Sequence, residues 1–249
     1  MSRFKHIIDS PSTPYQNNNN TFSYQSTPQS TPYANLQGNP QNNMSPEQQQ
    51  ALAQAQANWP KVFNKAVIGL EYDGVINVDI GKPITSPDEW VPIPGSLEAI
   101  RTMRLKGYKV IILSDQGRIK KGLQSHEQVT AMHQKAMEMF GQAGIFNIDG
   151  FLYAESDMRD DIYAKPNIGM FEKAENEILN GARFKNGGFY VGHQMKDLKA
   201  AIRAGATPIL VRTGQGEETE KALQKFSAEK VRKRTKVFDS LLQFAQALK

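Results

Sequence analysis

The chain has 249 residues, a net charge of +5 and no cysteine, and this length allows one sizeable domain with an extension. The lack of cysteine excludes disulfides, a thiol nucleophile and a cysteine-based zinc site. No apolar run reaches the length of a membrane span, and the opening sequence MSRFKHIIDSPSTPY lacks the apolar core of a secretory signal, so we expect a cytoplasmic protein, or one incorporated in a particle assembled in the cytoplasm, with no membrane partner.

Residues 1–58 differ in composition from the rest of the chain, because Asn, Gln, Ser, Thr and Pro dominate them. So little apolar surface does not offset the entropy of ordering, and we expect a disordered tail. A short helix over 45–57 is the exception, since S-P-E-Q at its start resembles a capping box with proline at the first helical position. The tail is interpreted as a spacer. Alternatively, it is a docking arm that folds on a partner through the aromatic residues Tyr15, Phe22, Tyr24 and Tyr33.

From residue 59 to residue 249, short apolar runs alternate with amphipathic segments. Strands are predicted at Ala66–Leu70, Tyr108–Leu113, Ile148–Tyr153, Phe189–Val191 and Pro208–Val211. Helices are predicted between them at Gly95–Leu105, Glu127–Gly141, Gly169–Leu179 and Lys196–Ala204. Strands that are apolar throughout and separated by helices indicate a parallel sheet covered on both faces. The fold class is therefore α/β, as one doubly wound domain.

Four segments lie at predicted carboxyl ends of these strands, where doubly wound sheets bind their ligands. They are GLEYDGVIN at 69–77, VIILSDQGRIKKG at 110–122, AKPNIGM at 164–170 and VGHQMKDLKAAIRAG at 191–205. In this order they resemble the motifs of the haloacid dehalogenase-like (HAD) superfamily and, within it, the histidinol-phosphate and heptose-bisphosphate phosphatases. Polynucleotide 3′-phosphatases have a related layout. The resemblance covers roughly residues 65–215 and implies a HAD-like fold with no large cap domain, hence an open site.

The resemblance implies a pocket in which one carboxylate attacks phosphorus, a second transfers protons and magnesium neutralises charge. Asp73 matches the acid/base position of the family. Ser114, Gln116 and Lys165 match positions that hold the phosphate oxygens. Asp197 matches the second acid of the last motif, and it would also suit the first turn of a helix.

Two positions depart from the family, because Glu71 stands where the nucleophilic Asp is expected and His193 where a magnesium ligand is expected. Glu is one methylene longer than Asp, and misplacing a reacting atom by about 1 Å costs roughly a hundredfold in rate. Imidazole is a poor ligand for magnesium, which selects oxygen. We therefore expect no cofactor, or magnesium if the protein is active. The implied metal positions, which would be vestigial with low occupancy, are Glu71, Asp73, His193 and Asp197.

These departures predict a catalytically degenerate HAD-like domain that acts as a regulatory or structural binding protein for a protein or an assembly. The alternative is a weak magnesium-dependent phosphomonoesterase with Glu71 as nucleophile, acting on a sugar phosphate or a nucleic-acid 3′-phosphate. Degenerate domains of this size with polar tails also resemble accessory proteins of large tailed phages, including head-assembly protease inhibitors, although no motif carries that idea.

A cluster of cations lies near the C-terminus in AEKVRKRTK at 228–236. It is interpreted as a solvated helical face and, alternatively, as a patch for nucleic acid through Lys230, Arg232, Lys233 and Arg234. No aromatic residue lies within this segment to support base stacking. A short strand and a helix are predicted after it, in KVFDSLLQFAQALK.

Overall fold

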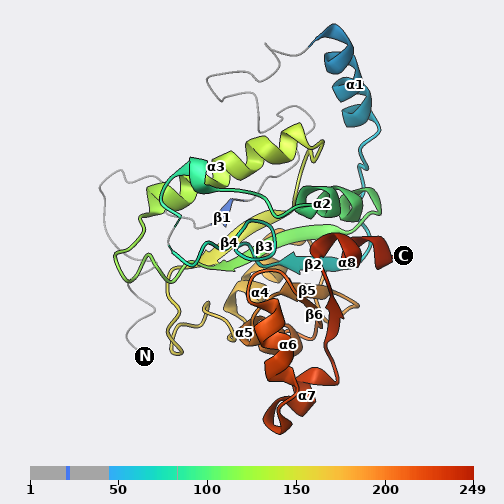
Figure 1. Cartoon of the computed structure of the whole chain (residues 1–249). Coiled ribbons are helices and arrows are strands. Elements are labelled where there is room, and N and C mark those ends of the chain that lie inside the picture. Colours follow the sequence, from blue (N-terminus) through green and yellow to red (C-terminus); the bar gives the residue numbers. More distant parts are fainter. Residues whose placement is uncertain (1–20, 23–44, 83) are drawn as a thin grey trace.

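The structure is a computed structural model of the whole chain, and it describes residues 21–22, 45–82 and 84–249. Most of the predicted disordered tail, with the proposed anchors Tyr15, Tyr24 and Tyr33, therefore lies outside the described residues. Within the described part, helix α1 (Pro46–Ala57) occupies the range in which the sequence predicts a short helix. Figure 1 shows this helix standing apart from the body of the molecule at one end.

Seven strands form one sheet in the order β1-β4-β3-β2-β5-β6-β7. Strands β2 to β7 run parallel, whereas β1 pairs antiparallel with β4 at one edge. This topology confirms the predicted doubly wound α/β fold. The strands are Thr21–Phe22 (β1), Val67–Leu70 (β2), Lys109–Asp115 (β3), Gly150–Ala154 (β4), Phe189–Gly192 (β5), Thr207–Val211 (β6) and Lys236–Phe238 (β7).

Helices cover both faces of the sheet, with α2, α3 and α8 on one side and α4, α5 and α6 on the other (Figure 1). The remaining α-helices are Ser96–Leu105 (α2), His126–Gln142 (α3), Gly169–Lys173 (α4), Met195–Arg203 (α5), Gly216–Leu223 (α6), Glu229–Arg232 (α7) and Leu241–Ala247 (α8). Other helical turns are Pro87–Glu89 (η3), the π-helical continuation of α4 at Ala174–Ile178 (η4), and Phe226–Ala228 (η5). The sequence-based strands and helices are all present. The helix α6 and the turns η3 and η5 were not predicted, and neither was β1, which lies within the tail expected to be disordered. In the described part, no helix is both long enough and apolar enough to cross a membrane.

Alternating side chains along the strands build two apolar cores, one on each face of the sheet. Ile68 and Leu70 of β2 pack in the core beneath α2, α3 and α8, where Ile100 of α2 is also fully buried. Val67 points to the other face and joins the core beneath α4 and α5, with Phe171. Because both faces are covered, the strand sequences are apolar throughout instead of alternating with polar residues.

The loops at the carboxyl ends of the strands carry no separate domain. Between Asp73 and Ser114 the described chain adds only η3 and α2 before β3, and between Ser114 and Lys165 it adds α3 and β4. This arrangement agrees with the expected fold without a large cap. The carboxyl edge of the sheet is therefore bordered by loops alone.

A buried ionic cluster lies at the opposite, amino ends of β3 and β4. Arg104 of α2 donates through Nη1 to Asp149 and to the carbonyl of Tyr108, and through Nη2 to Oδ1 of Asn147 at 2.7 Å. The indole of Trp59 donates to the same Asn147 oxygen at 3.0 Å. The cluster therefore joins α2, the residues just before β4 and the segment that follows α1.

Candidate active site

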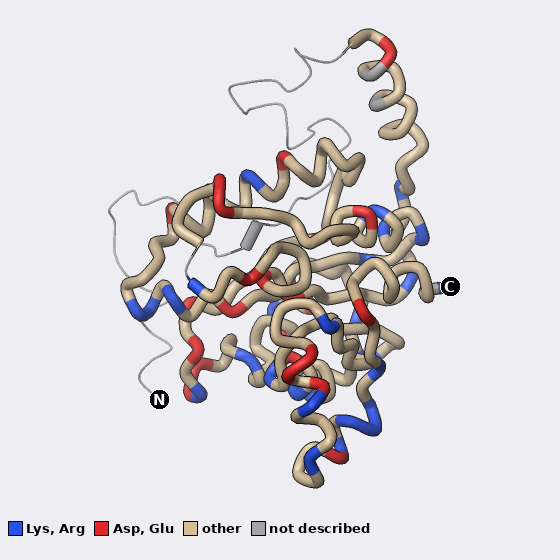
Figure 2. The backbone as a smooth tube through the Cα atoms, viewed as in Figure 1, with Lys and Arg blue, Asp and Glu red and all other residues tan. Residues whose placement is uncertain are grey.

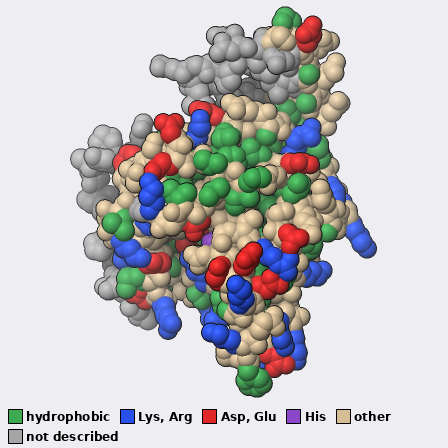
Figure 3. Space-filling model, viewed as in Figure 1, with side chains coloured by type: hydrophobic (Ala, Val, Ile, Leu, Met, Phe, Trp, Pro, Cys, Tyr) green, Lys and Arg blue, Asp and Glu red, His purple; other side chains and the backbone are tan. Residues whose placement is uncertain are grey.

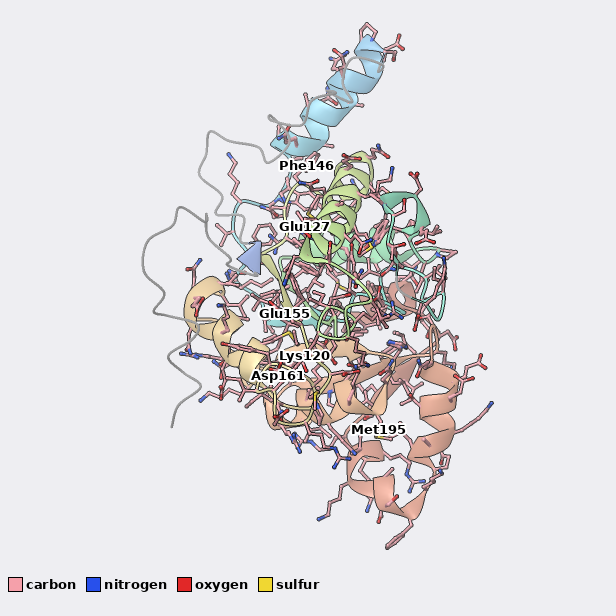
Figure 4. All side chains as sticks on the ribbon, turned by 90° about the vertical axis from the view of Figure 1, so that its left-hand side faces the viewer. Lys120, Glu127, Phe146, Glu155, Asp161 and Met195 are labelled. Carbon is pink, nitrogen blue, oxygen red and sulfur yellow. The ribbon has the colours of Figure 1, made fainter. Side chains whose placement is uncertain are left out.

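Four strand ends bring the sequence-predicted site residues together. Glu71 and Asp73 follow β2, Ser114 lies at the end of β3, Lys165 precedes α4, and Asp197 lies in the first turn of α5 after β5. The loops after β3 and β4 border this edge. The backbone N–H of residue 120 donates to the carbonyl of residue 155 at 3.1 Å, and Figure 4 labels both side chains in this region.

Both carboxylate oxygens of Glu71 are engaged. Its Oε1 accepts hydrogen bonds from the backbone N–H of Tyr72 at 2.8 Å and from Oγ of Ser114 at 2.7 Å, and its Oε2 is ion-paired with Nζ of Lys165. The side chain is 6% exposed, so these contacts form away from bulk water. Glu71 thus contacts two groups that the family uses to hold phosphate, and a phosphate that binds here must take its place at Ser114 and Lys165.

Lys165 is the cationic centre of the site. Besides Glu71, its Nζ lies 2.9 Å from Oδ1 of Asp197 and donates to the hydroxyl of Tyr190 at 2.7 Å. That hydroxyl in turn donates to the carbonyl of Leu113 at 2.6 Å. Burial lowers the pKa of Lys165 to about 8, although the carboxylate of Asp197 opposes the shift. The ammonium is therefore charged at neutral pH and closer to losing its proton than an exposed lysine.

Asp73 lies beside this ionic group and is held by Gln116. The amide Nε2 of Gln116 lies 3.4 Å from Oδ2 of Asp73 and donates to Oγ of Ser114 at 3.1 Å, so it links the two positions. Burial raises the pKa of Asp73, while hydrogen bonds and the charge of Arg118 oppose the shift. A raised carboxyl pKa suits a group that must give a proton to a leaving oxygen near neutral pH.

Asp197 has both of the roles that the sequence left open. Its Oδ2 accepts hydrogen bonds from the backbone N–H groups of His193 at 3.1 Å and Gln194 at 2.9 Å, and so caps the start of α5. Its Oδ1 faces Lys165. Burial alone would raise the pKa of Asp197, but Lys165, His193 and Lys196 together outweigh it, and the net direction is downward. Asp197 is therefore a charged carboxylate that positions Lys165.

The imidazole of His193 connects two loops. The ring Nδ1 accepts a hydrogen bond from the backbone N–H of Gln215 at 2.9 Å, and the backbone carbonyl of His193 accepts one from the hydroxyl of Thr219 at 2.8 Å. The ring lies between two glycines, since a Cβ would come within 2.7 Å of it at Gly74 and within 2.4 Å at Gly214. Burial lowers the pKa of His193, and a neutral ring that accepts at Nδ1 carries its proton on Nε2. Neither nitrogen is then a free donor for a metal.

The residues present do not fit a magnesium ion. Glu71 and Asp197 both contact the ammonium of Lys165, and His193 binds a backbone N–H. Across residues 45–82 and 84–249, no three acids or histidines gather closely enough to hold a metal. Magnesium demands near-octahedral oxygen coordination. The structure therefore does not gather the implied metal positions, which include Asp73, around a single ion site. We assign no chemical step to a metal.

Sequence reasoning missed a second ion pair at the site. Oδ2 of Asp115 lies 2.6 Å from Nζ of Lys196, and its Oδ1 accepts from the backbone N–H of Lys165 at 3.2 Å. Burial raises the pKa of Asp115 to about 6, against the charge of Lys196. The signal was available, because Asp115 directly follows Ser114 and Lys196 directly precedes Asp197. This pair joins the end of β3 to the start of α5.

Comparisons with known proteins support one family. A model of the polynucleotide kinase 3 phosphatase family matches residues 73–201, and a HAD-hydrolase-like model matches residues 162–244. The D-glycero-beta-D-manno-heptose-1,7-bisphosphate 7-phosphatase of Neisseria meningitidis is 33% identical over 181 residues, covering 72% of this chain and 92% of the relative. The enzyme of the same name from Pseudomonas putida is 33% identical over 180 residues, covering 72% and 97%.

A solved structure agrees with these relatives. The crystal structure of D,D-heptose 1.7-bisphosphate phosphatase from B. bronchiseptica, complexed with magnesium and phosphate, is similar with a TM-score of 0.65 and 29% identity. It covers 73% of this chain and 97% of that chain. The similarity therefore extends over nearly the whole enzyme and not over an isolated motif.

These findings correct the main functional prediction. The interpretation as a catalytically degenerate, regulatory or phage-type accessory protein is wrong, because relatives at about one-third identity over most of their length are phosphatases. The prediction gave too much weight to Glu71 and His193. Glu71 still supplies a carboxylate, and this carboxylate contacts Ser114 and Lys165.

The resemblance inferred from the four motifs is confirmed by family models, relatives and fold together. The parallel sheet places those motifs at adjoining strand ends, as the family requires. The chain belongs to the HAD-like superfamily, in the branch of the heptose-bisphosphate phosphatases.

Proposed function

We propose that the protein is a phosphoric monoester hydrolase that acts on a sugar phosphate. The observation that carries the proposal is the direct contact of the Glu71 carboxylate with Ser114 and Lys165, beside Asp73. A phosphate held by the hydroxyl and the ammonium would lie next to the carboxylate that attacks it. The relatives named as heptose-bisphosphate phosphatases supply the substrate class.

The chemistry proceeds in two displacements. A carboxylate oxygen of Glu71 bonds to phosphorus, the bond from phosphorus to the ester oxygen breaks, and Asp73 gives its proton to that leaving oxygen. Asp73 then takes a proton from water, whose oxygen bonds to phosphorus as the bond to Glu71 breaks. Inorganic phosphate leaves, and both carboxyl groups return to their starting states.

The same contacts predict a slow enzyme. Substrate must displace Glu71 from Ser114 and Lys165 before it binds, and the longer side chain carries its oxygen away from the position of an Asp. A misplacement of about 1 Å costs roughly a hundredfold in rate. The expected turnover is therefore weak but dependent on Glu71.

The test is release of inorganic phosphate by the purified protein from a heptose bisphosphate and from a generic aryl phosphate, each with magnesium and with a chelator. Glu71→Gln keeps the shape of the side chain and is expected to abolish turnover, whereas Lys185→Gln, at an exposed position on the surface, is the matched control. Turnover that survives Glu71→Gln unchanged would contradict the proposal.

A second candidate substrate is a nucleic-acid 3′-phosphate. It is supported by the match of residues 73–201 to the polynucleotide kinase 3 phosphatase family and by the lack of a cap in the described part. The same assay with a 3′-phosphorylated oligonucleotide compares the two classes. The expected cytoplasmic location and protein partners remain predictions.

A further inference from the structure

A groove with a volume of about 530 Å³ lies between α5 and α7. Ile202 and Val231 contribute apolar surface to its wall, and both are partly buried. Every other lining residue is a cation, and no acidic side chain lines it. These cations are Lys199, Arg203, Lys230, Lys233 and Arg234.

The cations form two rows at helical spacing. Lys199 and Arg203 are four residues apart on α5, and Lys230, Lys233 and Arg234 are three and four residues apart on α7 and its end. Residues at these spacings lie on one face of a helix. All five side chains are exposed, so each helix presents a row of positive charge to the groove.

Little of this charge is neutralised within the protein. Lys233 pairs with Glu229 at 2.6 Å, and Arg203 donates to a backbone carbonyl. Among the residues that the structure describes, no carboxylate forms an ion pair with Lys199, Lys230 or Arg234. Figure 2 shows basic residues along the lower part of the chain at α7, and charged side chains cover the same region of the surface in Figure 3.

We propose that this groove binds a nucleic-acid strand through its phosphate backbone. Two rows of regularly spaced cations match a polymer whose charges recur at a fixed interval, and such contacts need no particular sequence. The surface of an acidic protein has no such regular spacing. The groove is also larger than one phosphate group requires.

The structure changes which basic residues carry this binding. Arg232 was included in the sequence-based patch, yet it donates to Oε1 of Gln224 at 3.2 Å and does not line the groove. Lys199 and Arg203 were not included, because they lie about thirty residues earlier. Lys199 is two residues after Asp197 on α5 and faces away from it, so the groove is distinct from the phosphatase site.

The test measures fluorescence anisotropy of a labelled single-stranded oligonucleotide with hydroxyl ends, which offers no phosphomonoester to the site of Glu71. The groove variant is Lys199→Glu, Lys230→Glu and Arg234→Glu together. The control variant is Lys61→Glu, Arg101→Glu and Lys120→Glu, which changes the net charge equally at exposed positions that do not line the groove. Circular dichroism and the melting temperature establish that each variant is folded.

We expect the groove variant to lose at least about a hundredfold in affinity for the oligonucleotide. The slope of the logarithm of the binding constant against the logarithm of the salt concentration should fall in magnitude by about 2, as loss of three phosphate contacts predicts for a single strand. The control variant should keep the slope. Equal losses in both variants, or no binding by the wild type, would overturn the proposal. Polyglutamate binding as tight as the oligonucleotide, and lost in the groove variant alone, would also overturn it in favour of an acidic protein. Because Glu71→Gln is expected to bind the oligonucleotide normally, failure here is separable from failure of the phosphatase proposal.

Discussion

Two buried ionic clusters lie at opposite ends of the same sheet and differ in what their charges contact. At the amino ends, Arg104 and Asp149 bind each other and the backbone, since Asp149 also accepts from the N–H of Val110 at 2.8 Å. At the carboxyl ends, Glu71 and Asp197 share the ammonium of Lys165. The first cluster holds strands in place, whereas in the second Lys165 is shared between the side chains of Glu71 and Asp197, each of which also accepts from the backbone.

The difference separates charges that support the fold from charges available to a ligand. A backbone group bonded by Asp149 has no other partner to take, so exchange would leave it unsatisfied. The hydroxyl of Ser114 and the ammonium of Lys165 can exchange Glu71 for a phosphate oxygen without loss of hydrogen bonds. Burial of charge alone therefore does not mark a functional site, and the identity of the partner does.

The largest effect is expected at the amino-end cluster. Asp149→Ala leaves Arg104, which is 2% exposed, as a buried cation without its carboxylate. Breaking a buried pair in this way costs about 3–5 kcal/mol of unfolding free energy. Urea unfolding measures it, with Asp239→Ala at an exposed ion pair as control. A loss no larger than that of the control would show that the amino-end cluster does not support the fold.

The next effect concerns rate. Glu71→Asp shortens the side chain by one methylene and is expected to raise kcat by about a hundredfold, because the attacking oxygen returns to the position that the family uses. Unfolding free energy should change much less than in Asp149→Ala. A slower enzyme after this change would mean that Glu71 is already placed for attack in this site.

A smaller effect is expected where the two loops meet at His193. His193→Ala leaves the N–H of Gln215 without its acceptor and an empty slot between Gly74 and Gly214. An unsatisfied buried donor costs about 1–3 kcal/mol. The melting temperature should fall together with turnover, and His193→Gln, which retains an acceptor, should recover part of both. Stability unchanged in the alanine variant would contradict the connecting role.

The smallest effect is a pH dependence of anion binding. Sulfate keeps its charge across the range, so its affinity reports on Lys165, whose pKa is about 8. Affinity should be constant below that value and weaken up to about tenfold per pH unit above it. Lys165→Arg should remove this dependence, because arginine stays charged. Calorimetric titration that shows constant affinity up to pH 10 in the wild type would contradict the lowered pKa.

The lowered pKa of Lys165 weakens anion binding as pH rises but increases the free energy of unfolding. Between about pH 8 and 10.5 the unfolded chain keeps a proton on Lys165 that the folded protein has lost. The unfolded state then binds more protons, so this group makes the folded state more stable as pH rises through that window.

Much of the fold could be predicted from local sequence patterns, because short apolar runs indicate buried strands and apolar residues at helical spacing indicate amphipathic helices. The positions of Asp73, Ser114 and Lys165 followed from motifs at strand ends. The contacts of Glu71 could not be predicted from these motifs, since the side-chain rotamer determines whether its carboxylate contacts Lys165 or solvent. Tyr190 was interpreted only as part of an apolar strand, although its hydroxyl contacts Lys165.

Features that join distant segments were also beyond reach. An arginine in an amphipathic helix is normally expected on the exposed face. Arg104 is buried because it bonds to Asn147 and Asp149, which lie more than forty residues away in the sequence. The groove between α5 and α7 needs the packing of two helices that sequence analysis considered separately. In each case the missing information was tertiary proximity and not residue type.

The indole of Trp59 has a practical consequence for immobilising the protein. It is bound to Asn147 and packs edge-on against Phe146, with ring centroids 5.2 Å apart, at the amino ends of the strands. The segment that follows α1 is therefore anchored at the end of the sheet remote from Glu71. A fluorophore or a surface linker attached to an exposed residue of α1, such as Glu47, would be held apart from the candidate site.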